Sequence, residues 1–369
     1  MKILVFNWQD IKNPFGGGAE VHFHEIFKRI AAMGNEVTLF CSQFAGALDE
    51  EIIDGIRVIR EGTRNFFNFN VKNKYNTVFS KENFDIVIDD LNKIPFYTPR
   101  FVKEPLIVIC HHFFGKSIFR EAGRIQGSYV YFAERRISRI YKNTPFAVVS
   151  ESTKQECIER GIKEEYISIV PNAINQNEFP MAVGEKYDFP CVAYFGRMKK
   201  YKSVDHLLKA FALIKNKIPT AQLHLLGRGD NLPELKKLAK NLGISDRTTF
   251  FGYVSEEDKK KLLSKSHIVV NTSMKEGWGI TNIEANACGT PVLSADVPGL
   301  RDSVAVGKSG LLYEYGNIKQ LSDLILELFT DKIKLNNLSH GAVEWASIFS
   351  WDDSAMKMLK MCEEVIERK

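Results

Sequence analysis

Residues 268–284 read IVVNTSMKEGWGITNIE, and this run decides the predicted fold. It begins with a short apolar segment rich in β-branched side chains, passes through a loop with two glycines, and continues with helical periodicity. A buried strand that leads through a glycine-bearing loop into a helix is typical of parallel sheets covered by helices. Such a loop lies at the carboxyl end of a strand and at a helix N-terminus, where we expect a ligand.

The same alternation of strands and amphipathic helices occurs twice along the chain. In the first half we expect strands at 3–7, 36–41, 56–59, 85–89, 106–110, 146–149 and 167–170, and a helix at 19–33. In the second half we expect strands at 191–195, 222–226, 249–251, 267–271 and 291–294, with helices at 204–216, 232–242, 256–264 and 281–288. The pattern predicts two Rossmann-like α/β lobes whose parallel sheets face each other across a ligand-binding cleft.

A polar, turn-rich stretch separates the two halves. We therefore predict a first lobe over 1–174, a linker over 175–189 and a second lobe over 190–350. The remaining segment, 351–369, is predicted to be a terminal helix. Two domains also agree with the length of 369 residues, which is more than one hydrophobic core usually serves.

The composition excludes several classes of protein. Hydrophobic residues make up 44% and charged residues 26% of the chain, which is an ordinary globular balance. The longest apolar stretches, such as 106–110, are too short to span a bilayer, and the N-terminal run shows no signal-peptide pattern. The six cysteines are scattered without a Cys-x-x-Cys pair, which favours free thiols and a cytoplasmic location.

Positive charge is concentrated between Arg100 and Lys142. This segment holds nine basic and three acidic residues, a local excess of six, whereas the whole chain has a formal net charge of +5. Such a patch attracts phosphates, anionic lipid or nucleic acid. No nucleic-acid recognition motif lies beside it, so we expect no nucleic-acid partner.

Aromatic residues alternate with arginines in this basic segment, and two interpretations remain open. The aromatics are Tyr129, Tyr131, Phe132 and Tyr141, and the arginines are Arg135, Arg136 and Arg139. The segment is either an amphipathic helix that touches the inner face of an anionic membrane peripherally, or a helix with aromatics in the core and arginines in solvent.

The first candidate site is the glycine run Gly16, Gly17 and Gly18, which follows the first strand and opens the first helix. Successive glycines allow close backbone approach and leave N–H groups at a helix N-terminus free for an anion. The run is not Gly-x-Gly-x-x-Gly, and no acidic residue closes the second strand, which argues against a nicotinamide enzyme. A flexible turn is the alternative interpretation.

The second candidate site lies at the start of the second lobe. Gly196 and Arg197 follow a strand, and Lys202 precedes a helix. Two fixed cations at this turn would neutralise a diphosphate and hold the charge that grows when one leaves. A solvated basic loop is the alternative.

The third candidate is the opening stretch itself. Glu276 lies in the loop after the strand, directly before Gly277, and Glu284 lies in the helix that follows. Two carboxylates eight residues apart could bind the hydroxyl groups of a polyol, and Gly277 and Gly279 allow close backbone approach. The helix N-terminus would face a phosphate.

His111 and His112 end the fifth strand of the first lobe. Neighbouring histidines on a strand point to opposite faces, and no further ligands lie at metal-binding spacing, so we expect no metal site. The remaining interpretations are a buried, hydrogen-bonded histidine and a donor or general base at the edge of the cleft.

In order along the chain, these motifs resemble those of the family 4 glycosyltransferases, which have the GT-B fold. The matching stretches are Gly16–Glu20, Pro171–Ile174, Gly196–Lys202, Leu226–Gly229, Phe251–Val254 and Glu276–Val292. Three positions depart from the usual pattern: Ala173 and Ser203 replace glycines, and Arg228 stands where an acidic residue is common. The terminal segment from Phe349 resembles the family's last helix, which crosses back onto the first lobe.

The resemblance implies a retaining transfer of a hexose-type sugar from a UDP- or GDP-sugar, without a metal ion or other cofactor. The acceptor would be a glycan or a lipid-linked molecule. It implies catalytic roles for His111, Arg197, Lys202 and Glu276. The implied donor-binding residues are Gly16, Gly17, Gly18, Gly196, Arg197, Lys202, Tyr253, Val254, Glu276, Gly277, Trp278, Gly279, Ile280, Thr281 and Glu284. The alternatives are a nucleotide-sugar epimerase or hydrolase with the same fold, and a non-catalytic subunit that binds a nucleotide sugar.

Overall fold

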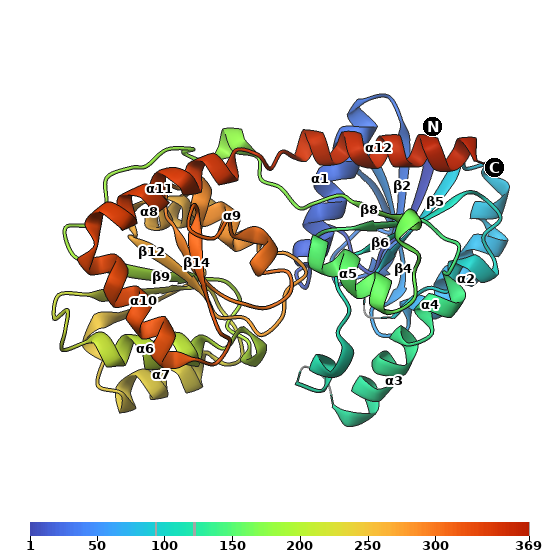
Figure 1. Cartoon of the computed structure of the whole chain (residues 1–369). Helices are drawn as coiled ribbons and strands as arrows, with labels where there is room; N and C mark the ends of the chain where they lie inside the picture. The colour runs from blue at the N-terminus through green and yellow to red at the C-terminus, as the bar shows by residue number, and fades with distance from the viewer. Residues whose placement is uncertain (93, 121–122, 369) are drawn as a thin grey trace. The chain divides into compact units, whose positions relative to one another are not determined.

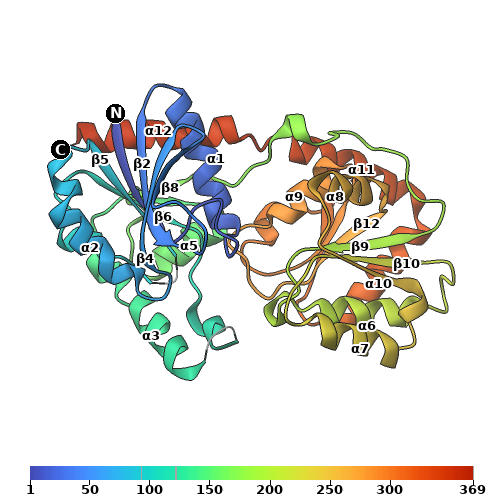
Figure 2. The same cartoon turned by 180° about the vertical axis from the view of Figure 1, so that it is seen from behind.

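The computed structural model of the chain describes residues 1–92, 94–120 and 123–368. The chain forms two compact units, one of residues 1–173 with the segment from Trp351 onward, and one of Ile174–Ser350. Each unit has one central sheet with helices on both faces (Figures 1 and 2).

The first unit is built on an eight-stranded sheet of order β3-β4-β2-β1-β5-β6-β7-β8 within the described residues. Its strands are β1 Lys2–Phe6, β2 Glu36–Gln43, β3 Glu50–Ile53, β4 Ile56–Thr63, β5 Ile86–Leu91, β6 Leu106–Cys110, β7 Phe146–Val148 and β8 Ile167–Ile169. Its α-helices are α1 Gly18–Ala32, α2 Phe67–Thr77, α3 Arg124–Glu134, α4 Ile137–Ile140, α5 Glu151–Glu159 and α12 Trp351–Glu367. Within the described residues, the strand pairs of this sheet are parallel except β3 with β4.

The second unit has a six-stranded parallel sheet of order β11-β10-β9-β12-β13-β14. Its strands are β9 Cys191–Phe195, β10 Gln222–Leu226, β11 Thr248–Gly252, β12 Ile268–Asn271, β13 Val292–Ala295 and β14 Gly310–Tyr313. Its α-helices are α6 Val204–Ile214, α7 Leu232–Asn241, α8 Glu256–Lys265, α9 Ile280–Ala287, α10 Ile318–Thr330 and α11 Lys332–Ala346. Helices α8, α9 and α11 cover one face of the sheet, and α6, α7 and α10 cover the other (Figure 1).

Short 3₁₀ turns complete both units. They are η1 Phe79–Lys81, η2 Thr98–Arg100, η3 Gly115–Arg120, η4 Glu164–Tyr166, η5 Gln176–Glu178, η6 Lys200–Lys202, η7 Ser245–Arg247 and η8 Arg301–Ser303.

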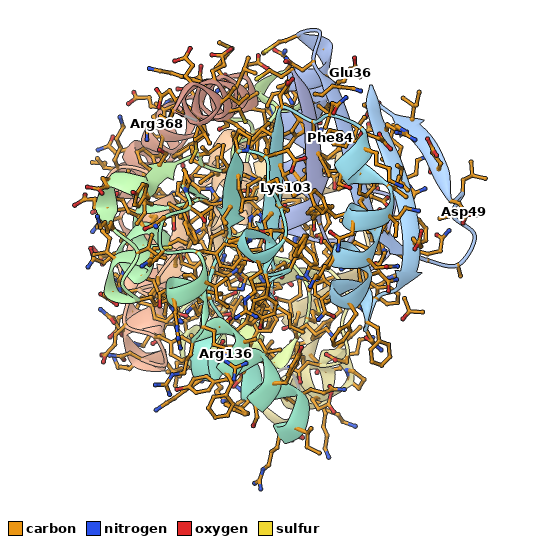
Figure 3. The ribbon with its side chains drawn as sticks, turned by 90° about the vertical axis from the view of Figure 1, so that its right-hand side faces the viewer. Glu36, Asp49, Phe84, Lys103, Arg136 and Arg368 are labelled. Carbon is orange, nitrogen blue, oxygen red and sulfur yellow. The ribbon has the colours of Figure 1, made fainter. Side chains whose placement is uncertain are left out.

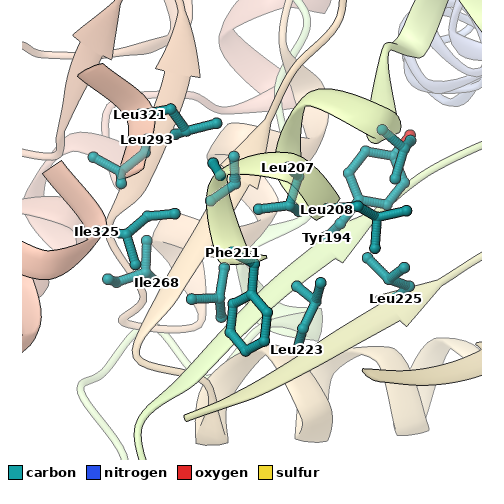
Figure 4. Packing of buried hydrophobic residues seen from close by; sticks show 14 of the residues in the cluster. Tyr194, Leu207, Leu208, Phe211, Leu223, Leu225, Ile268, Leu293, Leu321 and Ile325 are labelled. Carbon is teal, nitrogen blue, oxygen red and sulfur yellow. The ribbon is translucent and has the colours of Figure 1, made fainter. Parts of the chain in front are cut away.

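The core of the second unit shows why its helices form where the periodicity predicts them. Leu207, Leu208 and Phe211 recur on one side of α6 and are fully buried against the sheet (Figure 4). They share this core with residues of the sheet, including Leu223 of β10 and Ile268 of β12. Because burying one such side chain stabilises a fold by roughly 1.5–3 kcal/mol, this face fixes the helix on the sheet.

The C-terminal helix α12 packs within the first unit. The ring of Trp351 meets the ring of His22 on α1 edge to face, and Ser354 Oγ donates a hydrogen bond to Pro171 O at 2.9 Å. Arg29 on α1 forms an ion pair with Asp352 at 2.5 Å. The predicted fold class, α/β with two parallel-sheet units and a helical C-terminus on the first, is confirmed.

The predictions missed two strands. The edge strand β3 carries two glutamates and few buried side chains, and it returns antiparallel through Asp54 and Gly55, both at positive φ. Strand β14 has only four residues. Strand β5 continues to Leu91, two residues beyond its predicted end, because its polar residues Asp89 and Asp90 are both buried within the sheet.

The segment predicted as a linker packs on the second unit. The ammonium group of Lys186 donates hydrogen bonds to Ser264 O at 2.8 Å, Gly289 O at 3.0 Å and Thr290 Oγ1 at 2.8 Å. All six cysteines are free and buried. Among the described residues, no helix has the length and apolar character needed to cross a membrane.

Candidate functional site

In the second unit, two loops at the carboxyl ends of neighbouring strands are joined by hydrogen bonds. Met274 N donates to Tyr201 O at 2.9 Å, and Thr272 Oγ1 donates to Lys202 O at 2.7 Å. The first loop follows β9 and the second follows β12, and these strands pair in the sheet. The sheet topology therefore brings together two sequence stretches that are about 70 residues apart.

This contact pairs Lys202 with Glu276. The ammonium group of Lys202 donates to Glu276 Oε1, and the two side chains are only 14% and 19% exposed. Burial lowers the pKa of Lys202, whereas the charge of Glu276 and the hydrogen bond to Glu276 raise it. The rise is larger than the fall, so the pKa of Lys202 is raised overall. Lys202 is therefore held as a cation in a place with little water, where its charge acts strongly on a ligand.

Arg197 lies on the same turn but is exposed to solvent. Its backbone is fixed, since Tyr194 Oη donates to Arg197 O at 3.0 Å. The structure thus brings Lys202 and Glu276 into contact, and it leaves the guanidinium group of Arg197 able to move toward an anion.

Several glycines of this unit make room for neighbouring backbone. A Cβ atom at Gly227 would lie 2.0 Å from Gly196 O, and one at Gly229 would lie 2.1 Å from Met198 O. A Cβ atom at Gly279 would lie 2.2 Å from Ser303 Oγ. Gly279, which was predicted to allow close backbone approach of a ligand, is therefore also required by the packing between loops.

Gly299 was not predicted, yet it supports the Glu276 loop. Its φ is +80°, and a Cβ atom there would lie 2.1 Å from Glu276 O. A glycine between two loops leaves no periodic signal in the sequence, so only the fold reveals this role.

Gly299→Ala is expected to displace Glu276 and to lower any catalytic activity that depends on this carboxylate about tenfold or more, since misplacing a catalytic group by about 1 Å can cost 10²-fold. Gly307→Ala is a matched control, because Gly307 has a similar φ of +78° but nothing within 4 Å of the added Cβ. Both variants share the left-handed backbone strain. Kinetic assays and melting curves check this, and equal losses of activity in both variants would contradict the role of Gly299.

Glu284 has its own cationic partner, Lys259. Lys259 Nζ lies 2.9 Å from Glu284 Oε1 and 2.5 Å from Glu256 Oε2, and it stands 4.7 Å from the centre of the Phe195 ring. Burial raises the pKa of Glu284, and Lys259 opposes that rise. Sequence reasoning missed Lys259, which lies within a run of three lysines on α8; helical phase was the only signal that could separate it from its exposed neighbours.

The start of α9 is held by buried amides and hydroxyls that were also missed. Asn282 Nδ2 donates to Ser294 Oγ at 3.2 Å and to Ser303 Oγ at 2.9 Å. Asn271 Nδ2 donates to Asn282 Oδ1 at 3.2 Å and to Thr281 Oγ1 at 3.1 Å. This network fixes the N-terminus of α9, which begins at the partly buried Ile280 and follows Glu276 and Gly277 in the chain.

Trp278 and Tyr253 complete the predicted donor-binding residues of this unit. Trp278 Nε1 is buried without a hydrogen-bond partner among the described residues, and its ring meets Phe349 edge to face at 5.2 Å. Tyr253 is 70% exposed, beside the half-buried Val254, and the guanidinium group of Arg228 lies 5.4 Å from its ring centre. This ring is an open stacking surface rather than a closed slot.

In the first unit, a polar cluster lies at the ends of β1, β5 and β6. Asp90 accepts a hydrogen bond from Asn7 Nδ2 at 2.9 Å, and its Oδ1 lies 2.9 Å from His111 Nε2. Asn7 Oδ1 is buried and has no hydrogen-bond partner among the described residues. Burial lowers the pKa of His111, whereas the charge of Asp90, the hydrogen bond to Asp90 and the charge of Glu20 raise it. Together these charges and the hydrogen bond outweigh burial, so the pKa of His111 is raised overall.

The two predicted histidines diverge. His111 is buried in the polar cluster, and the ring of His22 meets it edge to face at 5.1 Å. The ring of His112 is tilted against the ring of Phe114, with 4.6 Å between the ring centres. His111 is hydrogen-bonded to a carboxylate, which leaves Nδ1 as the ring nitrogen that Asp90 does not engage. Asp90 and Asn7 are site residues that sequence reasoning missed.

The glycine loop differs from its prediction. Gly17 N donates to Glu20 Oε2 at 2.6 Å, and Gly16 N donates to Asn13 O at 2.9 Å. These two N–H groups are therefore not free for an anion. Glu20 caps its own helix through Gly17 N, and the carbonyl oxygen of Asn13 binds Gly16 N. Gly18 begins α1, and a Cβ atom there would meet nothing within 4 Å.

Within the described part of the chain, no three His, Cys, Asp or Glu side chains are grouped so that they could hold a metal ion. Two Rossmann-like units with fixed polar groups at the carboxyl ends of their parallel strands define the GT-B class of proteins.

The comparisons with known proteins agree with this class. The family model described as "Glycosyl transferases group 1" matches residues 175–345, and the model "Glycosyltransferase Family 4" matches residues 16–178. The chain belongs to these family 4, or group 1, glycosyltransferases.

Individual relatives are similar over parts of their length. Mannosylfructose-phosphate synthase of Agrobacterium fabrum is 27% identical over 61% of this chain and 54% of its own. The D-inositol 3-phosphate glycosyltransferase of Nocardia farcinica is 35% identical over 50% of this chain and 41% of its own. The chain thus matches about half the length of these curated relatives. An uncharacterized glycosyltransferase of Methanocaldococcus jannaschii is 24% identical over 100% and 99% of the two chains.

Solved structures share the fold over the whole chain. Sucrose-phosphate synthase from Thermosynechococcus elongatus has a TM-score of 0.82 at 19% identity, covering 100% of both chains. HepE of Anabaena, solved in complex with UDP-glucose, has a TM-score of 0.75 at 18% identity, covering 99% of this chain and 100% of its own.

Proposed function

We propose that this protein is a retaining glycosyltransferase that moves a hexose-type sugar from a UDP- or GDP-sugar to a glycan or lipid-linked acceptor, without a metal ion. The observation that carries the proposal is the partly buried Lys202–Glu276 pair on two joined loops of the second unit. It lies within the segment that matches the group 1 glycosyltransferases. The complexes of the similar HepE with UDP and UDP-glucose also support a nucleotide-sugar donor.

The second unit offers what a departing diphosphate needs. When the bond between the sugar and the diphosphate breaks, negative charge grows on the phosphate oxygen. Lys202, which is held in a poorly solvated place, and the exposed Arg197 would stabilise that charge. A preorganised group such as Lys202 usually makes the largest catalytic contribution. Glu276 holds Lys202 in position and would accept hydrogen bonds from sugar hydroxyls.

Retention is proposed to occur by attack on the same face of the sugar. The acceptor oxygen forms the new bond to the anomeric carbon as the bond to the diphosphate breaks, and the acceptor proton passes to the leaving phosphate oxygen. This route needs no carboxylate nucleophile. In the first unit the charge of Asp90 raises the pKa of His111, and the protonated His111 would donate a hydrogen bond from Nδ1 to the sugar.

Peripheral contact with an anionic membrane is the proposed role of part of the basic segment. Ile125, Tyr129 and Phe132 on α3 are 88%, 48% and 57% exposed, beside the exposed Arg135. Tyr141 is fully buried, so the core interpretation is correct for that residue. Glu121 and the side chain of Arg120 lie outside the described residues. Salt-sensitive pelleting with anionic vesicles tests the proposal, and no pelleting at low salt would reject it.

A thermal-shift panel of UDP, GDP, ADP, CDP and TDP, each with magnesium or with EDTA, tests the donor site. We expect one nucleotide to raise the melting temperature equally in both conditions, since a ligand at 100 times its Kd stabilises by about 2.7 kcal/mol. A shift that requires magnesium would overturn the metal-independent proposal. Release of sugar without acceptor would favour a hydrolase, and binding without any turnover would favour a non-catalytic subunit.

A further inference from the structure

A basic pocket lies in the first unit, apart from the groups described so far. Its volume is about 420 Å³, and it is lined by Pro99, Arg100, Arg136, Arg139 and Ile140. Arg100 ends the turn η2, whereas Arg136 precedes α4 and Arg139 lies within it. Figure 3 shows the side chain of Arg136 on the outer surface of this unit, beside α3. The three-residue spacing places Arg136 and Arg139 on one side of the helix.

Within the part of the chain that the structure describes, the three guanidinium groups have no carboxylate partners. None of them makes an ion pair or a side-chain hydrogen bond with a residue that the structure describes, and Arg100 only stands over the Tyr97 ring at 5.3 Å. Other arginines of this unit are paired, such as Arg57 with Glu50 and Arg160 with Glu156. Three like charges around one cavity repel each other, so the pocket favours an anion.

One buried carboxylate fixes both walls of the pocket. Asp89 Oδ2 accepts a hydrogen bond from Thr98 Oγ1 at 2.5 Å and from Tyr141 Oη at 2.6 Å. Thr98 precedes Pro99 in the turn, and Tyr141 follows Ile140 at the end of α4. Burial raises the pKa of Asp89 to about 6, and these two hydrogen bonds oppose the rise. Asp89 is therefore a carboxylate at neutral pH. The arginines are thus carried on two elements that are held in place before any ligand binds.

We propose that this pocket binds a phosphate or diphosphate group on the acceptor. Guanidinium groups match phosphate oxygens with paired N–H donors, and three of them can neutralise the charge of a diphosphate. Asp89 and Asp90 are consecutive on β5 and point to opposite faces of the sheet. The end of this strand therefore supports the pocket through Asp89 and binds His111 through Asp90. That the molecule carrying the phosphate is the acceptor rests on the proposed transferase function, whereas the binding of phosphate itself does not.

Isothermal titration of the full chain with pyrophosphate, at constant ionic strength, tests the pocket. We expect R136Q and R139Q each to weaken binding about tenfold or more, which is the effect of losing one charge-assisted hydrogen-bonding group. R124Q is the matched control, because Arg124 is exposed in the same basic segment but does not line the pocket. R197Q shows how much pyrophosphate binds at the donor loops. Equal affinity in wild type, R136Q and R139Q would overturn the proposal.

Two further arms identify the source of the phosphate. One measures sugar 1-phosphate binding in solution, and the other measures sedimentation with vesicles of phosphatidic acid in phosphatidylcholine. Loss of either interaction in R136Q and R139Q, with R124Q unchanged, supports the pocket and names its carrier. The nucleotide panel is run on the same variants. If R136Q loses pyrophosphate but no nucleotide binds the wild type, the donor-site proposal fails while the phosphate pocket stands.

Discussion

Lys202→Gln is expected to lower the turnover of sugar transfer by about 10²–10³-fold, the cost of losing one preorganised group that stabilises charge in the transition state. Lys202 is 14% exposed, and its backbone carbonyl accepts a hydrogen bond from Thr272, so its ammonium group is held in place on the joined loops. The variant also leaves Glu276 without its partner, which adds the penalty of an uncompensated carboxylate. Steady-state assays with donor and acceptor measure the effect.

Lys200→Gln is the matched control for this variant. Lys200 is two residues earlier in the same turn but is exposed, so its removal lowers the charge of the loop without touching the pair. We expect its turnover to stay within about twofold of wild type, since exposed charges contribute little. If Lys202→Gln kept nearly full activity, or if both lysine variants lost the same amount, the diphosphate role of Lys202 would be wrong.

His111→Asn is expected to reduce turnover roughly 10²-fold or more, as removal of one preorganised hydrogen-bond donor at a reacting centre does. Asp90→Asn tests the same group through its pKa. The charge of Asp90 raises the pKa of His111 against burial, so the neutral asparagine should lower that pKa. Because the proposed role needs the protonated ring, the alkaline limb of the kcat/KM profile should move to lower pH in Asp90→Asn.

A second histidine–aspartate pair supplies the control. His24 Nε2 lies 2.8 Å from Asp54 Oδ2 at the surface of the same unit, so Asp54→Asn removes an equivalent partner away from the polar cluster. Its pH profile should match that of the wild type. A profile whose acid limb moved in Asp90→Asn would instead indicate that His111 acts as a general base. No movement of either limb would leave His111 as a structural residue and reject its proposed role.

The local predictions succeeded where one residue pattern decides the outcome. The ends of β6, β9 and β10 agree with the predicted strands, because these buried runs stop at glycine or polar residues. The loop after β12 and the helix that carries Glu284 were also predicted from the opening stretch. Burial, periodicity and glycine placement act over a few residues, so they can be read in order along the chain.

The sequence by itself determined the fold class, the family and the segments that carry Lys202, Glu276 and His111. Only the tertiary structure decided which groups meet: Lys202 with Glu276, Glu284 with Lys259, and Asp90 with His111. It also showed that Glu20 occupies the Gly17 N–H group and that three arginines surround one pocket. These contacts join residues far apart in the chain through the order of strands in each sheet, and no local pattern encodes that order.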